Sequence, residues 1–149
     1  MSTQSAIKAR LEADATLVAT ATGGIYDFDE TGRLGINRGN TPAAFDATTG
    51  VIKPTVLVRL RSRNPDFVLQ DDTSQYQSVR DMVELWFYQD SGYTTIETMR
   101  DRCFALLHAT QVTGAFAVRW AGDIRGQYDF ELNASVERSD YQVNTRRSV

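Results

Sequence analysis

Cysteine and histidine are almost absent from the 149-residue sequence, which contains one of each, Cys103 and His108. A single cysteine excludes an internal disulfide and a cysteine-based zinc cage. Both residues fall on one predicted helix, where their spacing turns the side chains about 140° apart and excludes a Cys–His nucleophilic pair. We interpret Cys103 as core and His108 as a favourable partner of the helix C-terminal dipole.

Long apolar runs and a strong net charge are also missing. No segment approaches the roughly 20 apolar residues that span a bilayer. The first residues, 1–5, lack the basic residues and apolar run of a signal peptide. The formal net charge of −3 gives no overall field toward nucleic acid or an anionic membrane. We therefore expect a chain that folds and stays in a reducing cytoplasm, with no membrane partner.

The length and the hydrophobic periodicity predict a single domain over residues 1–149. Helices are expected over residues 5–19 and 93–109, and strands over 25–28, 55–61, 78–89, 115–120 and 128–137. A turn is expected at 121–123, between the last two strands. This order predicts an α+β fold with an antiparallel, at most mixed, sheet of about four to five strands and two helices on one face.

The strand predicted over residues 78–89 has apolar side chains on both faces. Val83, Leu85 and Phe87 alternate with a second set made of Met82, Trp86 and Tyr88. The helix over 93–109, whose Glu97, Arg100 and Asp101 are predicted to face outward, can cover only one of these faces. We therefore expect the second set to contact another subunit.

The segment 29–53 is rich in glycine and polar residues and predicts a long loop after the first short strand. Its opening Asp-x-Asp-x-x-Gly pattern resembles half of a calcium loop, but Arg38 stands where a bidentate glutamate is needed, so no metal site is predicted. We expect the loop to be mobile in the free subunit and to contact a partner through Arg33, Arg38 and Phe45. Residues 140–149 read as a polar C-terminal tail.

Three arginines alternate along the strand 55–61 and its exit. Alternation would align Arg59, Arg61 and Arg63 in a stripe about 13 Å long on one face. A stripe of this kind protects an exposed edge, or contacts an acidic neighbouring subunit or DNA. For a subunit contact, the candidate acidic partners are Asp71, Asp72 and Glu131.

The assembled pattern resembles the tail terminator (tail-completion) proteins of long-tailed bacteriophages over nearly the whole chain. The residues that carry the resemblance form soft core and turn patterns in five segments: Leu11-x-x-Asp14-x-x-Leu17, Gly23-Gly24-Ile25-Tyr26, Pro54-Thr55-Val56-Leu57-Val58, Val83 to Tyr88, and Gly92-Tyr93 to Leu106-Leu107.

The resemblance implies a ring-forming subunit, typically hexameric, that stops polymerisation of the tail tube and joins it to the head connector. Its partners would be copies of itself, the tail tube protein and neck proteins, with non-specific contact to DNA crossing the lumen. The implied place is the tail or neck of a virion assembled in the host cytoplasm, with no enzymatic activity and no cofactor. A head–tail connector or stopper protein is the first alternative. A small cytosolic enzyme or ligand-binding domain is the second.

Overall fold

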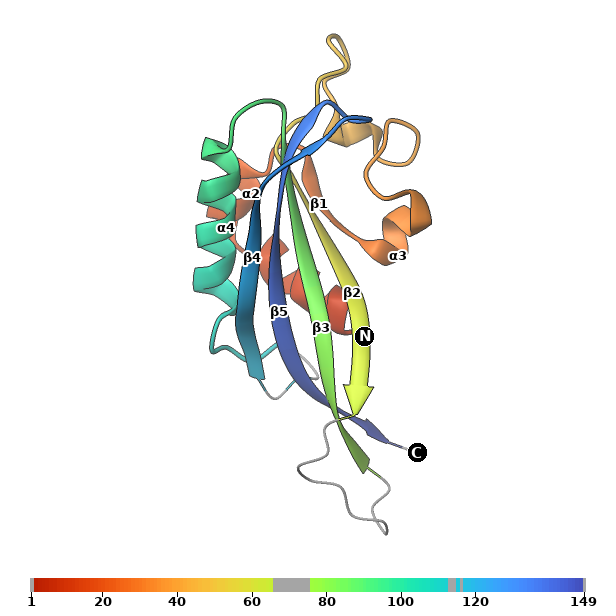
Figure 1. Ribbon diagram of the computed structural model, residues 1–149, viewed down its shortest axis with the longest axis vertical. Coiled ribbons are helices and arrows are strands. Elements are labelled where there is room, and N and C mark those ends of the chain that lie inside the picture. The colour runs from red at the N-terminus through yellow and green to blue at the C-terminus, as the bar shows by residue number, and fades with distance from the viewer. Residues whose placement is uncertain (1, 66–75, 113–114, 116, 149) are drawn as a thin grey trace.

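The computed structural model describes residues 2–65, 76–112, 115 and 117–148. It contains a five-stranded sheet with the strand order β1-β2-β3-β5-β4 (Figure 1). β1 is parallel to β2, and every other pair of neighbours is antiparallel. The α+β class with a mixed sheet is therefore confirmed. The strand bounds are β1 (Gly24–Asp27), β2 (Thr55–Pro65), β3 (Tyr76–Gln89), β4 (Ala117–Asp129) and β5 (Ala134–Ser148).

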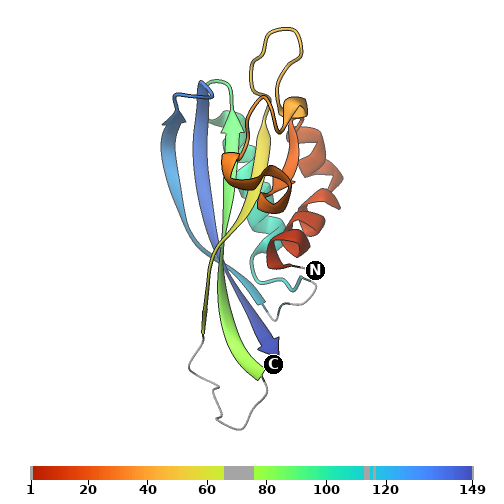
Figure 2. The same cartoon turned by 90° about the vertical axis from the view of Figure 1, so that its right-hand side faces the viewer.

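Three helices cover one face of the sheet (Figure 2): α1 (Thr3–Glu12), α2 (Ala15–Thr20) and α4 (Thr94–Leu107). The apolar core between these helices and the sheet includes Ile7, Leu11, Leu17, Val58, Val83, Leu85, Phe87, Ile96, Met99, Cys103, Leu107, Val118 and Tyr141. In the described ranges, no helix has the length and apolar character needed to cross a membrane.

The single helix predicted over residues 5–19 is wrong, because the chain breaks it at Ala13 and Asp14. The Asp14 side chain accepts a hydrogen bond from the backbone N–H of Leu17 at 2.8 Å and so acts as the N-cap of α2. Aspartate favours this position because its carboxylate satisfies a free backbone donor at the helix start. Arg102 of α4 holds the same carboxylate, with Nε to Oδ2 at 2.9 Å, which fixes α2 against α4.

The opposite face of the sheet is covered by the segment predicted to be a mobile loop. This segment forms α3 (Phe28–Thr31) and two short 3₁₀ turns, η1 (Gly32–Leu34) and η2 (Pro42–Ala44). It buries Ile36, Ala44, Phe45 and Ile52 in a second core with Leu57, Tyr88, Ala134 and Val136. The expectation that residues 29–53 lack the apolar residues to pack on their own domain is therefore wrong.

β4 and β5 form a hairpin whose turn lies at residues 130–133, inside the strand predicted over 128–137. The Asp129 carboxylate accepts hydrogen bonds from the N–H groups of Glu131 and Leu132 at 2.9 and 3.0 Å, and Asn133 has a φ of 50°. Asparagine tolerates this left-handed conformation better than most residues. The alternation of apolar residues in the sequence therefore runs on through residues that local polar contacts fold into a turn.

The turn predicted at Ala121-Gly122-Asp123 is also wrong, because β4 runs through it without ending. The β4–β5 pairing shifts register at Trp120/Gly122 and again at Ile124/Gln127. Gly122 has a φ of 135°, a conformation that glycine adopts readily at a bulge. The polar tail predicted over residues 140–149 is also wrong. These residues belong to β5, the second strand of the same hairpin, which continues to Ser148 and buries Tyr141 and Val143.

Candidate functional site

The predicted second face of β3 does not stand bare in the isolated chain. Tyr88 is only 8% exposed under the 29–53 segment, and Trp86 and Met82 are partly buried. The assignment of side chains to faces is confirmed, because Val83, Leu85 and Phe87 lie in the helix-side core and Tyr88 does not. The statement that this face has no cover within the chain is wrong, so an interface that includes Met82, Trp86 and Tyr88 stays an untested prediction.

The three arginines of the predicted stripe do not share one face of β2. The pairing of β2 with β3 shifts register after Leu60, and a bulge of this kind moves the following side chains to the other face. Arg59 lies over the ring of Phe28, 5.0 Å from its centroid. Arg63 instead donates from Nε and Nη2 to the fully buried Asp81 carboxylate at 2.8 and 3.0 Å, where α1 also reaches Asp81.

The acidic groups near Arg61 belong to its own chain. Arg61 lies 3.8 Å from Glu84 and 3.9 Å from Asp140, and Arg138 lies 3.6 Å from Glu84 and 3.0 Å from Asp140. Trp86 donates from Nε1 to Glu84 at 2.8 Å, which orients the carboxylate. The two arginines and the two carboxylates form a neutral cluster on the face of the sheet that also carries the second core.

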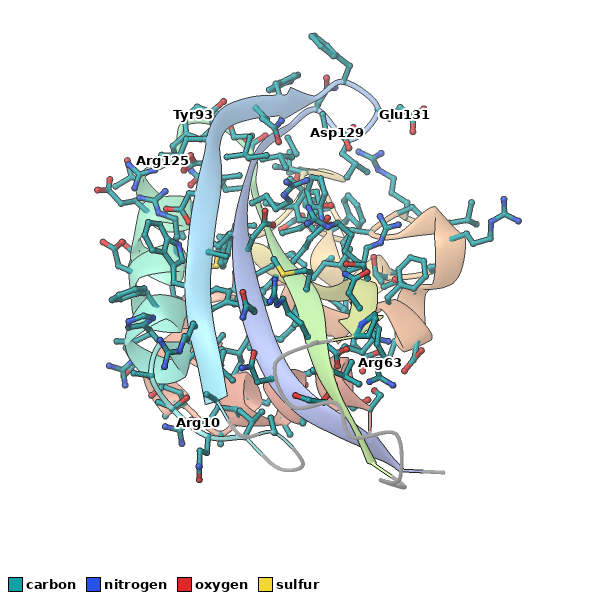
Figure 3. All side chains as sticks on the ribbon, turned by 60° about the horizontal axis from the view of Figure 1, so that its bottom comes forward. Arg10, Arg63, Tyr93, Arg125, Asp129 and Glu131 are labelled. Carbon is teal, nitrogen blue, oxygen red and sulfur yellow. The ribbon has the colours of Figure 1, made fainter. Side chains whose placement is uncertain are left out.

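The acidic partners proposed for the stripe have different outcomes. Asp71 and Asp72 lie outside the described residues. Glu131 is exposed in the β4–β5 turn (Figure 3), where it lines a pocket together with Trp86 and Tyr88 of β3. Among the described residues, Glu131 forms no ion pair with Arg59, Arg61 or Arg63, so its pairing with the stripe stays a prediction.

The three residues predicted to contact a partner in the 29–53 segment also behave differently. Phe45 is 6% exposed and belongs to the second core. Arg38 lies over its ring, 4.9 Å from the centroid, and donates to the carbonyl of Gly50 at 3.0 Å. Arg33 is exposed and has no ion pair or hydrogen bond with any described residue, so of the three it is the free side chain.

Cys103 is fully buried, and burial raises the pKa of its thiol, so it acts as a core residue. His108 is the C-cap of α4 and stacks on Phe104, with ring centroids 4.8 Å apart; its Nδ1 accepts a hydrogen bond from the backbone N–H of Trp120 at 3.1 Å. Within the described ranges, no group of three His, Cys, Asp or Glu side chains is placed to hold a metal ion.

β4 is the long edge strand of the sheet, and exposed aromatic side chains lie near both of its ends. Phe104 and Trp120 are 42% and 44% exposed and meet edge to face, with centroids 6.0 Å apart. Tyr128 and Phe130 are 45% and 84% exposed, with centroids 5.0 Å apart. Apart from the short bridge of Thr110 to Val118, the described residues place no strand on the outer side of β4. Exposed aromatic groups beside an uncovered edge are typical of an interaction surface.

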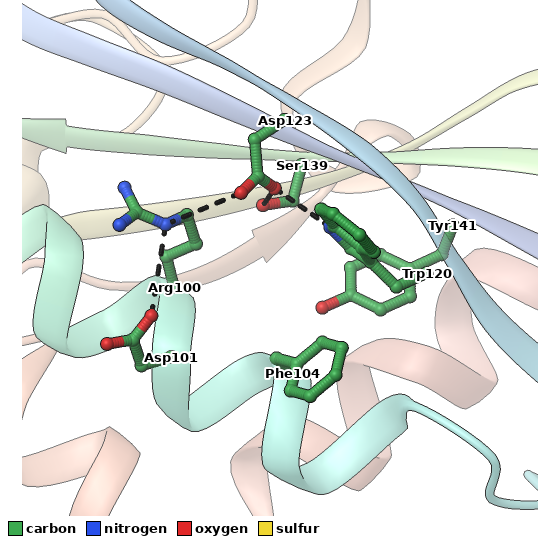
Figure 4. Close-up of a pocket in the computed structure, with 7 residues that line it drawn as sticks. All are labelled: Arg100, Asp101, Phe104, Trp120, Asp123, Ser139 and Tyr141. Carbon is green, nitrogen blue, oxygen red and sulfur yellow. Dashed lines mark hydrogen bonds and ion pairs between the residues drawn. The ribbon is translucent and has the colours of Figure 1, made fainter.

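A pocket of about 220 Å³ opens between α4 and the strands β4 and β5 (Figure 4). Its floor contains Tyr141, which is fully buried and whose hydroxyl has no hydrogen-bond partner. The hydroxyl is turned toward the space between Arg100 and Phe104 (Figure 4). We name this site the β4 pocket; its lining residues are Arg100, Asp101, Phe104, Trp120, Asp123, Ser139 and Tyr141.

The charged side chains at the β4 pocket form a largely buried network of ion pairs. Arg100, predicted to face outward, is 5% exposed and binds Glu137 at 2.7 Å and Asp123 at 3.7 Å. Burial alone would raise the pKa of Asp123, but hydrogen bonds from neighbouring side chains and the nearby guanidinium groups bring it below its usual value. Asp123 therefore stays ionised at neutral pH. Arg125 lies 3.4 Å from Asp123, while Asp101 is 72% exposed at the rim.

Sequence reasoning did not find the β4 pocket. Its members come from α4, β4 and β5, and they meet only because Trp120 pairs with Tyr141 across the hairpin. The sequence does not predict this pairing, because the turn predicted at 121–123 ends the strand directly after Trp120. An available signal was the set of aromatic and acidic residues at Asp101, Phe104, Trp120 and Asp123.

Neither a protein-family model nor a curated protein matches the sequence. In solved structures, the fold is similar to that of a chain in the virion of a native gene transfer agent (GTA) particle, with a TM-score of 0.65. The two chains are 14% identical, and the likeness covers 97% of this chain and 95% of the other. At this identity the likeness is one of fold.

Proposed function

We propose that the chain is a structural subunit of a phage-like virion, forming a homo-oligomeric ring that terminates the tail tube and joins it to the head connector. The observation that carries the proposal is the fold likeness to a virion chain over nearly the full length of both proteins. The resemblance of the sequence to tail terminator proteins supports the narrower role and a hexameric ring.

The two edges of the sheet support assembly with identical copies. One edge has β4 with its exposed aromatic residues, and the other has the short β1 followed by α3 and η1. Two different surfaces on opposite sides of one molecule suit a head-to-tail contact, which closes into a ring when the rotation between neighbours closes.

The partners of the ring would be the tail tube protein on one side and neck proteins on the other. The split of the arginine stripe removes most of the support for a belt that contacts DNA, since Arg61 and Arg63 have acidic partners in their own chain. DNA passing the lumen would then meet Arg59 and other exposed cations only, without sequence readout.

Deletion of the gene, followed by electron microscopy of the particles, tests this function. A terminator predicts tail tubes of uncontrolled length that do not join filled heads. The alternative, a head–tail connector or stopper, predicts tails of normal length beside unjoined heads. Normal, infectious particles would refute both roles.

A further inference from the structure

The 3₁₀ turn η1 forms a protruding knob at the edge opposite the β4 pocket. Arg33 and Leu34 occupy it, and Leu34 is 75% exposed. Gly32 and Gly35 on either side both have a φ of 63°, which favours glycine and fixes the tight turn. Asn40 donates from its side chain to the carbonyl of Thr31 at 2.8 Å and anchors the base. The knob therefore presents one free cation beside one apolar side chain on an ordered support.

The β4 pocket offers the complementary chemistry. Around it, the carboxylates of Asp101, Asp123 and Glu137 face the guanidinium groups of Arg100 and Arg125, which leaves an excess of one negative charge. The exposed rings of Phe104 and Trp120 form an apolar and π-rich rim, which attracts both a guanidinium group and an aliphatic side chain.

The Tyr141 hydroxyl is an independent indication that the pocket receives a ligand. It is buried without a partner in the isolated chain, and a buried polar group in that state is unfavourable. A donor entering from outside would satisfy it. The volume of about 220 Å³ is below the roughly 300–1,000 Å³ of small-molecule sites, so a single inserted side chain suits it better than a cofactor.

We propose that the Arg33–Leu34 knob of one copy inserts into the β4 pocket of the next copy and forms the head-to-tail junction of the ring. The inference rests on the proposed ring function and specifies its contact. The knob and the pocket lie at opposite edges, since η1 follows α3 on the β1 side and α4 covers the β4 side (Figure 1). One molecule therefore cannot satisfy its own pocket.

The contact uses side chains and not an added strand. Two register shifts interrupt β4, at Trp120/Gly122 and Ile124/Gln127. Bulges of this kind break the continuous row of backbone donors and acceptors that a further strand would need. The guanidinium of Arg33 would lie between the aromatic rim and the carboxylates of Asp101 and Asp123, with Leu34 against Phe104 or Trp120.

The test measures the protein concentration at which half of the chain is in rings, by light scattering after size-exclusion chromatography. Arg33→Glu and Asp101→Arg should each raise this concentration by about tenfold or more, because each puts like charges together in the junction. The matched controls Arg80→Glu and Asp90→Arg change the same charges at exposed positions outside the contact and should assemble as wild type does. Tyr141→Phe should weaken assembly without lowering the melting temperature of the monomer, since the lost hydroxyl has no partner there.

Mixing the two charge variants separates loss of the junction from loss of folding. Each variant keeps one native half of the contact, and the two altered halves have complementary charges. An equimolar mixture of Arg33→Glu and Asp101→Arg chains should therefore regain rings at close to the wild-type concentration. If both single variants form rings at the wild-type concentration, the junction is overturned but the ring is not. The same holds if the mixture stays monomeric while wild type forms rings. A wild-type chain that never forms rings would overturn both.

Discussion

The buried ion pair of Arg100 and Glu137 should be a main determinant of stability on the β4 side. Both side chains are almost fully buried, at 6% and 4% exposure, and they bind at 2.7 Å. Removal of the cation in Arg100→Met leaves the Glu137 carboxylate buried without its charge partner, although the N–H of Gly126 still donates to it at 3.2 Å. Breaking a buried pair from one side costs about 3–5 kcal/mol.

For a chain of this size, each kcal/mol lowers the melting temperature by roughly 2–4 °C, so Arg100→Met should melt about 6–20 °C below wild type. The double variant Arg100→Met/Glu137→Leu should recover most of this loss, because apolar residues of similar volume replace a buried pair at little net change. Urea unfolding and calorimetry of the four proteins of this cycle give the coupling energy.

The matched control is Arg102→Met on the same helix. Arg102 is 40% exposed and its ion pair with Asp14 is only partly buried, so solvent screens the pair and the loss should be smaller than that of Arg100. A loss below about 1 kcal/mol for Arg100→Met, or a double variant as unstable as the single one, would refute the reasoning.

Three further perturbations test local features. Asn133→Gly should keep or slightly raise stability and Asn133→Val should lower it by about 1–2 kcal/mol, because a β-branched residue resists the left-handed conformation; equal melting temperatures would contradict the turn at 130–133. Phe45→Ala should cost about 3–5 kcal/mol and speed trypsin cleavage after Arg38 by loosening the 29–53 segment, whereas a wild type cut equally fast there would restore the mobile-loop interpretation. The pKa of Asp14 is lowered to about 2, mainly by its hydrogen bond to Arg102. Its stabilising effect is therefore fully present above about pH 5 and is lost as the pH falls through about 2, so the deficit of Asp14→Asn in urea unfolding should be constant above about pH 5 and shrink below it.

The alternation of apolar residues was sufficient to predict the architecture where strands run without interruption. It placed Leu85 and Phe87 on the helix face and Tyr88 on the other, as the structure has them. The same rule failed wherever a bulge or a turn changes the count by one residue. Arg63 is the clearest example, since a single extra residue in β2 moves it to the opposite face and to Asp81.

Two glycine-containing segments, residues 121–123 and 29–53, differ from their predicted structure. Gly122 favours the turn predicted at 121–123, but Gly122 and Gly126 instead allow the backbone of β4 to bulge while the strand continues. The few and widely spaced apolar residues of the segment 29–53 predict a loop that does not pack on its own domain. Ile36, Phe45 and Ile52 nevertheless converge on Tyr88, and such long-range packing has no period in the sequence.

The candidate site was the least predictable part. Of the residues expected to contact a partner, Arg33 is free, whereas Arg38 and Phe45 are held within their own chain. The β4 pocket depends on the register of one hairpin, which brings Trp120 beside Tyr141 and both against α4. Register is set by the turn, and the turn was placed wrongly.

Native mass spectrometry of the purified chain, alone and mixed with tail tube protein, tests the central claim most directly. The account predicts one closed species with an integer number of copies, six by the resemblance to tail terminators, that survives dilution and binds the tube. A monomer at every concentration, both alone and with the tube protein, would contradict the account.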